Sequence, residues 1–102
     1  MTNQEQQIML LWASVMPTEV NPPSEQHVFT WASSHPMEDI IDAVTQTGKK
    51  MAKNIAMGIP LEDDSAVRYT CGILGHKAEW QRELARRRAA NAAAVEQRRG
   101  QQ

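Results

Sequence analysis

Residues 35–60 read HPMEDIIDAVTQTGKKMAKNIAMGIP and carry the clearest helical pattern of the chain. Pro36 suits the first turn of a helix, where its missing N–H costs nothing, and Ser34 or His35 is expected before it as cap. Gly58-Ile59-Pro60 ends the pattern. Between these signals the apolar face of the helix is made of Met37, Ile40, Ile41, Val44, Thr47 and Met51. We therefore expect a long amphipathic helix in the middle of the chain.

Two shorter helices are predicted before it. The first covers residues 4–15, and the residues on its apolar face are Ile8, Leu11, Trp12 and Val15. It ends at Met16-Pro17, because proline disfavours a helical residue before it. Asn21-Pro22-Pro23 marks a connector. Ser24 is expected to cap a second, short helix, which closes at Ser33-Ser34-His35.

A fourth helix is predicted to begin at Asp63 or Asp64 as its cap. One side of it brings together Tyr69, Ile73, Trp80 and Leu84. Residues 85–102 are rich in alanine and arginine, which are strong helix formers, but alanine buries little area. We expect this part to project as a helix and to fray toward residues 100–102.

No segment alternates with the two-residue period of a strand, so the predicted fold is all-α. It is a small bundle of about four helices with a long C-terminal helix projecting from the body. Residues 1–84 form the helical core domain, and residues 85–102 form a basic, Ala/Arg-rich helical extension with a frayed tail. The side chains expected inside are Ile8, Leu11, Trp12, Phe29, Trp31, Ile40, Ile41, Val44, Tyr69, Ile73, Leu74 and Trp80.

Three glycines interrupt the predicted helices, and one short sequence pattern, which we call the echo, occurs twice. Gly72 and Gly75 either weaken the last helix or mark the close approach of another helix, and Gly48 either bends or weakens the middle one. Residues 7–19 and 26–38 share Gln, Trp-Ala-Ser, Pro and Glu at matching positions. This echo is either two copies of one helix-end module or a coincidence, since two copies are too few for a repeat architecture.

The chain has 102 residues and a mass of 11.5 kDa, which suits one small domain. A mean hydropathy of -0.54 with 41% hydrophobic residues allows a thin core and excludes a wholly disordered chain. One cysteine excludes an internal disulfide. The longest apolar run, residues 8–13, is far too short to span a membrane, and the first residues lack the basic region of a secretory signal. We therefore expect a cytoplasmic protein with no membrane partner.

No pattern in the chain predicts an enzyme, so we expect no catalytic residue, metal or cofactor. The candidate metal ligands lack the spacing of a zinc site, and they are His27, His35, Cys71 and His76. Cys71 flanks an apolar stripe and is expected to be a small buried hydrophobe rather than a nucleophile. The carboxylates that follow Pro36 and Leu61 suit helix starts better than acid–base chemistry. The three tryptophans are expected to pack in the core rather than stack on bases.

Charge is divided along the chain. Residues 1–48 hold six acids and no lysine or arginine, which gives −6. Residues 49–102 hold all eleven lysines and arginines against six acids, which gives +5. Such a division predicts either a polyanion-binding end or pairing between the two halves.

The positive charge is concentrated in residues 77–99, where seven lysines and arginines face three acids, a net charge of +4. Arginine suits phosphates because its planar fork donates hydrogen bonds in pairs. The alternative is a solvated helix whose arginines pair locally with Glu79 and Glu83. The residues predicted to bind nucleic acid are Lys77, Arg82, Arg86, Arg87 and Arg88, joined by Lys49, Lys50 and Lys53.

Three stretches resemble the C-terminal module of DnaD-like primosomal proteins. They are Phe29-x-Trp31, Ile40-Ile41-Asp42-Ala43 and Tyr69-x3-Ile73-Leu74, which together span about half of the chain. The family usually places a tryptophan soon after the Ile-Leu pair, whereas here Trp80 comes six residues after Leu74. The resemblance implies contact with single- or double-stranded DNA and with a protein in the start-up of replication.

Two functions follow from these observations. The first is a small DNA-associated accessory protein, in replication initiation of a bacterial or mobile-element system, that contacts phosphates with its basic C-terminal helix. The second is a non-DNA helical adaptor or inhibitor that binds a protein partner. Because the Ala-rich tail has little apolar area of its own, we also expect it to be shared with a second copy in a homo-oligomer.

Overall fold

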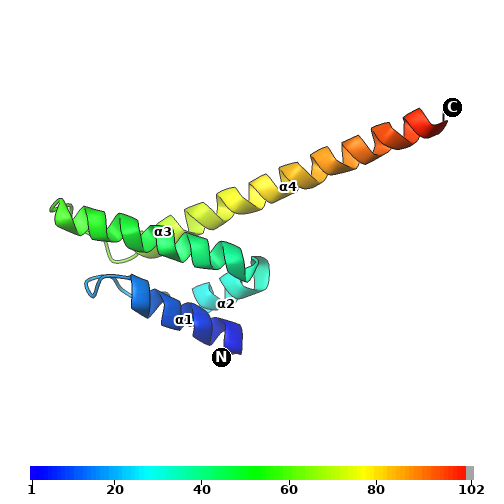
Figure 1. The fold of residues 1–102 in the computed structure, drawn as a ribbon. Coiled ribbons are helices and arrows are strands. Elements are labelled where there is room, and N and C mark those ends of the chain that lie inside the picture. The colour runs from blue at the N-terminus through cyan, green and yellow to red at the C-terminus, as the bar shows by residue number, and fades with distance from the viewer. Residues whose placement is uncertain (101–102) are drawn as a thin grey trace.

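The computed structural model describes residues 1–100, and every regular element in that range is an α-helix. In chain order the helices are α1 (Asn3–Val15), α2 (Glu25–Ser34), α3 (Met37–Ala56) and α4 (Ser65–Gly100). The predicted all-α fold with a long C-terminal helix is confirmed (Figure 1). The fraying expected for the tail falls partly on residues 101–102, which lie outside the described residues.

The helix starts follow the capping residues in the sequence. Thr2 caps α1, where its hydroxyl accepts a hydrogen bond from the Glu5 N–H at 3.2 Å. Ser24 caps α2 as predicted, accepting from the His27 N–H at 3.2 Å. The expected cap of α3 at Ser34 or His35 is wrong. Pro36 itself occupies the cap position with an extended ψ of 147°. Its carbonyl accepts a hydrogen bond from the Ile40 N–H, which closes the first turn of the helix.

Gly58 ends α3 in a conformation that needs glycine. Its φ is +72°, in the left-handed region. The Gly58 N–H bonds to the Ile55 carbonyl at 3.0 Å, and the Ile59 N–H bonds to the Asn54 carbonyl at 2.9 Å. These two bonds make a Schellman motif, which satisfies carbonyls at the end of the helix. The stop predicted at Gly58-Ile59-Pro60 is therefore confirmed.

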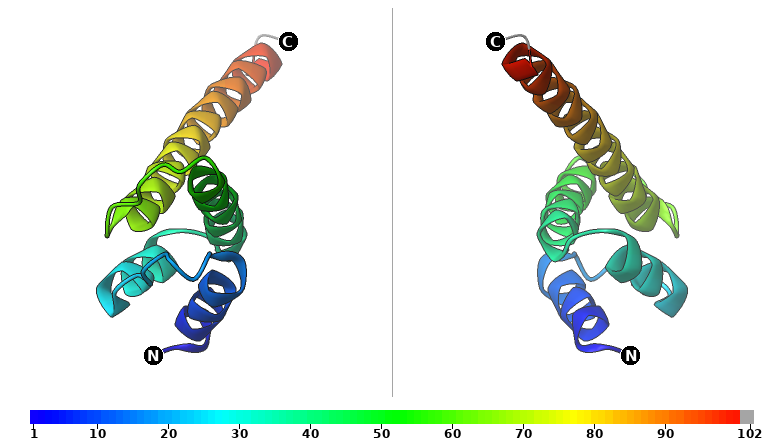
Figure 2. Two further views of the ribbon diagram at one scale, coloured as in Figure 1. Left: turned by 90° about the vertical axis from the view of Figure 1, so that its left-hand side faces the viewer. Right: turned by 90° about the vertical axis from the view of Figure 1, so that its right-hand side faces the viewer.

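Helix α3 lies at the centre of the molecule. It packs against α1, α2 and α4, whereas α4 packs on no other helix than α3 within residues 1–100. Two views at right angles to Figure 1 show α4 on the side of α3 away from α1, running obliquely out of the body (Figure 2). The core has these members: Ile8, Trp12, Val28, Trp31, Ile40, Ala43, Val44, Met51, Ala66, Val67 and Leu74.

Gly48 lets α1 approach α3 closely. A Cβ atom at Gly48 would lie 2.7 Å from the carbonyl oxygen of Val15, the last residue of α1. At Gly72 and Gly75 no heavy atom other than those of the neighbouring residues and the helix's own backbone lies within 4 Å of the corresponding position. The close approach that we considered for Gly72 and Gly75 is therefore wrong, and it occurs at Gly48 instead.

The sequence echo corresponds to two equivalent helix ends. The carbonyl of Trp12 accepts from the Met16 N–H at 2.9 Å, and that of Trp31 accepts from the His35 N–H at 3.0 Å. Each tryptophan thus lies one turn before the end of its helix. The two indole rings stack on each other with centroids 6.0 Å apart and planes 25° apart. The matched spacing therefore brings two large rings together between α1 and α2.

Several residues predicted to be buried are exposed. Phe29 is 59% exposed, Ile41 46%, Tyr69 39% and Trp80 55%, and Cys71 is exposed as well. The expectations that Trp80 packs in the core and that Cys71 is a buried hydrophobe are thus wrong. Ile8, Trp12, Trp31, Ile40, Val44 and Leu74 are buried as predicted, with Leu11 and Ile73 partly buried.

The errors on α4 have one physical cause. The helix faces α3 with Ala66, Val67, Thr70 and Leu74. At about 100° per residue, this face is rotated by roughly a quarter of a turn from the side that holds Tyr69 and Trp80. Small side chains let the two helices pack closely. With only α3 to pack against, α4 covers one face, which includes Leu74, and leaves Tyr69 and Trp80 exposed.

Candidate nucleic-acid interface

Three contacts fix how far α4 extends beyond the body. The Ser65 hydroxyl lies 3.9 Å from the Met51 sulfur, Thr47 and Thr70 are in contact through their hydroxyls at 2.7 Å, and the Lys77 Nζ lies 2.8 Å from the Asp42 carboxylate. The two helices are therefore antiparallel. Since α3 begins at Met37, α4 extends beyond this end of α3 soon after Lys77. Every residue from 85 to 100 is exposed, and we call residues 85–100 the projecting segment.

Lys77 belongs to the body and is already paired. Its side chain is 30% exposed and donates to Asp42, which also accepts from the Gln46 amide at 2.7 Å. The hydrogen bond from Lys77 lowers the pKa of Asp42, and the same bond raises the pKa of Lys77. Within residues 1–100 this is the one ion pair that joins the acidic half, 1–48, to the basic half. Lys77 is therefore poorly placed to contact a phosphate.

Local ion pairs neutralise part of the arginine cluster. Glu83 lies 2.9 Å from the Arg86 guanidinium and 3.1 Å from that of Arg87. Arg87 also lies over the ring of Trp80, 6.0 Å from its centroid. Arg82 makes no ion pair with Glu79, and instead its Nε donates to the carbonyl of Ala78 at 3.4 Å.

Four arginines keep their charge free of acids. In the part of the chain that the structure describes, no carboxylate lies within 4.0 Å of Arg82, Arg88, Arg98 or Arg99. Arg98 and Arg99 were not among the predicted residues. The signal that could have included them was the unbroken alanine-rich helix, which carries them on the same segment as Arg88.

The three lysines of α3 lie at the other end of the molecule. Because Thr47 meets Thr70, Lys50 is level with the first turn of α4. Arg86 is some twenty residues further on, about 30 Å at 1.5 Å per residue. Lys49, Lys50 and Lys53 are exposed but do not join the arginines in one surface. The structure thus separates the predicted set into two basic regions.

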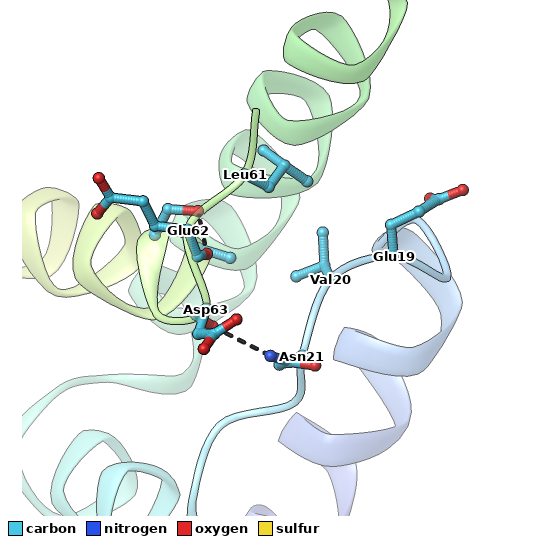
Figure 3. Close-up of a pocket in the computed structure, with 8 residues that line it drawn as sticks. Glu19, Val20, Asn21, Leu61, Glu62 and Asp63 are labelled. Carbon is cyan, nitrogen blue, oxygen red and sulfur yellow. Dashed lines mark hydrogen bonds between the residues drawn. The ribbon is translucent and has the colours of Figure 1, made fainter. Parts of the chain in front are cut away.

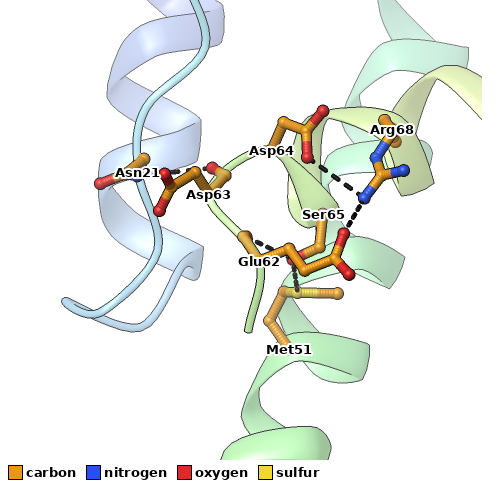
Figure 4. A network of polar contacts seen from close by, with 7 residues as sticks. All are labelled: Asn21, Met51, Glu62, Asp63, Asp64, Ser65 and Arg68. Atoms are coloured by element: carbon orange, nitrogen blue, oxygen red, sulfur yellow. Dashed lines mark hydrogen bonds and ion pairs between the residues drawn. The ribbon is translucent and has the colours of Figure 1, made fainter. Parts of the chain in front are cut away.

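The body offers little space for a small ligand at the junction of its two long loops. A cavity of about 30 Å³ lies between Val20 and Leu61, with Asn21 and Asp63 at its edge (Figure 3). That volume holds about one water molecule. The Asn21 amide donates to the Asp63 carbonyl at 3.4 Å and links the loops, while Arg68 bonds to Glu62 and Asp64 (Figure 4). These contacts give the acidic residues at the start of α4 a structural role.

Neither metal chemistry nor a membrane span is indicated by residues 1–100. No group of three or more His, Cys, Asp and Glu side chains in that range could hold a metal ion. None of the helices described is long and apolar enough to cross a bilayer.

No family of known proteins, no curated protein and no solved structure matches this chain.

Proposed function

We propose that this protein binds nucleic acid by phosphate contacts from Arg82 and the projecting segment. The observation that carries the proposal is a bare basic helix: residues 85–100 hold five arginines against one acid and pack on no other helix of the described chain. A lone helix is about 10–12 Å across with its side chains, which matches the width of the DNA major groove.

The chemistry of the segment favours backbone contacts over base recognition. Arg88, Arg98 and Arg99 have no acid partner, so binding a phosphate breaks no ion pair within residues 1–100. Arg86 and Arg87 must first break their ion pairs with Glu83, which reduces their contribution to phosphate binding. No aromatic residue follows Trp80, so the segment offers no ring on which bases could stack. Recognition by charge and shape implies weak sequence preference.

A role in the start-up of replication rests on the resemblance to the DnaD-like module alone. Of the residues that carry it, Trp31, Ile40 and Ala43 are buried, whereas Phe29 and Tyr69 are exposed. The resemblance therefore rests partly on residues that build the core, and nucleic-acid binding is the part of the proposal that the surface supports.

The test is binding to a short labelled duplex, measured by fluorescence anisotropy over a series of salt concentrations. Arg86→Gln, Arg87→Gln and Arg88→Gln together remove three charges and keep helix propensity. We expect weaker binding and a salt slope reduced by roughly 0.9 for each phosphate that the variant no longer neutralises. Lys49→Gln, Lys50→Gln and Lys53→Gln form the matched control, which removes the same charge from the far end of α3 and should leave the slope unchanged.

Protein binding is the second candidate function, favoured by the exposure of Tyr69 and Trp80 on α4. The same titration separates it from the first. If the unaltered protein does not retain the duplex at low salt, phosphate binding is wrong and the adaptor function takes its place. If the arginine and lysine triples weaken binding equally, the attraction is one of overall charge and the projecting segment is not the site.

A further inference from the structure

Several large apolar side chains of α4 lie outside the face that packs on α3. Tyr69, Trp80 and Val95 are 39%, 55% and 49% exposed, and Ile73 and Leu84 are partly buried. At about 100° per residue these five lie within an arc of about 80° along one side of the helix. We call them the apolar flank of α4, and it continues from the body onto the projecting segment.

The spacing of the apolar flank keeps it on one side of the helix. Tyr69 and Trp80 are eleven residues apart, as are Ile73 and Leu84, and Leu84 and Val95. Eleven residues exceed three helical turns by about 20°, so the flank winds slowly around the helix, in the opposite sense to a seven-residue repeat. From Tyr69 to Val95 it is about 39 Å long. A surface of this length fits another long helix.

We propose that the apolar flank is the contact between two copies of this chain, with their α4 helices antiparallel and crossing near residue 82. The proposal does not depend on the binding of nucleic acid. Around residue 82 the flank is self-complementary, as a two-fold axis requires. Trp80 and Leu84 are equally far from that residue, and so are Tyr69 and Val95. The antiparallel pairing therefore sets Trp80 against Leu84 and Tyr69 against Val95 of the other copy.

Charge favours the same arrangement. In each chain residues 1–64 hold nine acids and three lysines, a net charge of −6, whereas residues 65–100 hold eight lysines and arginines against three acids, a net charge of +5. Antiparallel pairing lays the projecting segment of one copy along the acidic body of the other. Its Arg98 and Arg99 come level with the start of the other α4, beside Asp63 and Asp64.

A parallel pair is opposed by the same charges. It would place the two acidic bodies side by side and would set Arg98 against Arg98, because this residue lies on the side of the helix that holds Trp80. Arg87 faces a cation in either direction, Arg87 in a parallel pair and Lys77 in an antiparallel one. Like charges held close together at an interface are unfavourable. The antiparallel pair separates the bodies to opposite ends of the contact. It also covers the projecting segment, which as a lone helix has little stability of its own.

Sedimentation equilibrium of the full chain tests the contact. We expect a monomer–dimer equilibrium, weakened about tenfold or more by Trp80→Glu with Leu84→Glu, since tryptophan is a common energetic centre of interfaces. Ala85→Glu with Ala89→Glu is the matched control, because it adds the same charge at the same spacing on the far side of the helix and should leave the equilibrium unchanged. Circular dichroism confirms that both variants keep their helices. A monomer at every concentration, or equal effects of the two variants, would overturn the proposal.

Disulfide cross-linking tests the direction of the pair. In a Cys71→Ser background, Ile73→Cys and Asn91→Cys place thiols at positions equally far from residue 82. Oxidation of an antiparallel pair joins the tryptic peptide 69–77 of one copy to peptide 89–98 of the other, which mass spectrometry detects. Links between two identical peptides, one from each chain, would show a parallel pair. The absence of any link between the two chains would contradict the shared flank.

Discussion

Thr47 and Thr70 form the one polar contact between fully buried side chains of α3 and α4. Their hydroxyl oxygens lie 2.7 Å apart, and each also lies within 2.9 Å of a carbonyl one turn earlier in its own helix, those of Ala43 and Ala66. Two hydroxyl protons thus serve three contacts. When one threonine donates to the other, it no longer donates to the carbonyl of its own helix. That carbonyl still accepts a backbone N–H, so no buried polar group is left without a hydrogen bond.

This sharing predicts that the two threonines are energetically coupled. Thr47→Val leaves Thr70 free to donate to Ala66, so we expect a loss of about 1 kcal/mol, the net value of one hydrogen bond. Thr70→Val should cost about the same. The double variant replaces both partners with apolar groups of the same shape and should cost less than the two single changes together. Urea unfolding of the four proteins measures this cycle, and additive losses would contradict the coupling.

At the scale of elements, local signals predict where helices start and stop. Ser24 caps α2, Pro17 follows α1, and Gly58 ends α3 within the predicted stop Gly58-Ile59-Pro60. These signals act through the backbone of neighbouring residues and need no knowledge of the rest of the fold. The bounds of the helices were accordingly predictable to within a residue or two.

The face that a helix buries is a different matter. For α4 the spacing predicts that the side with Tyr69 and Trp80 is buried, but the structure packs another face against α3. That face holds Ala66, Val67, Thr70 and Leu74. The face that is buried depends on which neighbouring helix is available and how closely it can approach. The spacing of apolar residues in a single helix predicts neither. The same limit explains why the glycine at a close contact is Gly48 and not Gly72.

The glycines of α3 and α4 should respond to alanine with opposite signs. Gly48→Ala places a methyl group against the backbone of Val15, and we expect a loss of about 1–3 kcal/mol in the free energy of unfolding. Gly72→Ala and Gly75→Ala meet open space, so each should gain about 0.5–1 kcal/mol through higher helix propensity. Chemical denaturation of the three variants checks this. A gain at Gly48 would mean that α1 does not approach α3 there.

At the scale of the whole molecule, the shape is far from compact. The radius of gyration is 18.5 Å and the longest dimension is 64 Å, whereas a compact domain of this length has a radius of gyration of about 13 Å. The charge division was visible in the sequence, and so was the projecting helix. The separation of the lysines from the arginines was not, because it follows from the antiparallel packing of α3 on α4.

Asp42 and Lys77 link the two oppositely charged halves, and this pair should make stability depend on pH. The bond from Lys77 holds the pKa of Asp42 below its ordinary value of 3.8, so the folded state favours the charged carboxylate. A lowered pKa adds stability above that ordinary value, and the contribution is lost as the pH falls through the folded-state pKa. For Lys77, whose pKa is raised above 10.5, the contribution is present below that value and is lost at higher pH.

Asp42→Asn should therefore destabilise the protein at neutral pH and lose that effect in acid. Both side chains are partly exposed, 46% for Asp42 and 30% for Lys77, so solvent screens the pair and the effect will be small and reduced by salt. Urea midpoints of the variant and the unaltered protein, compared at neutral pH and well below 3.8, measure it. Glu19→Gln is the matched control, since Glu19 makes no ion pair within residues 1–100. A difference between Asp42→Asn and the unaltered protein that persists in acid would assign the loss to the amide replacement and not to the charge that joins the two halves.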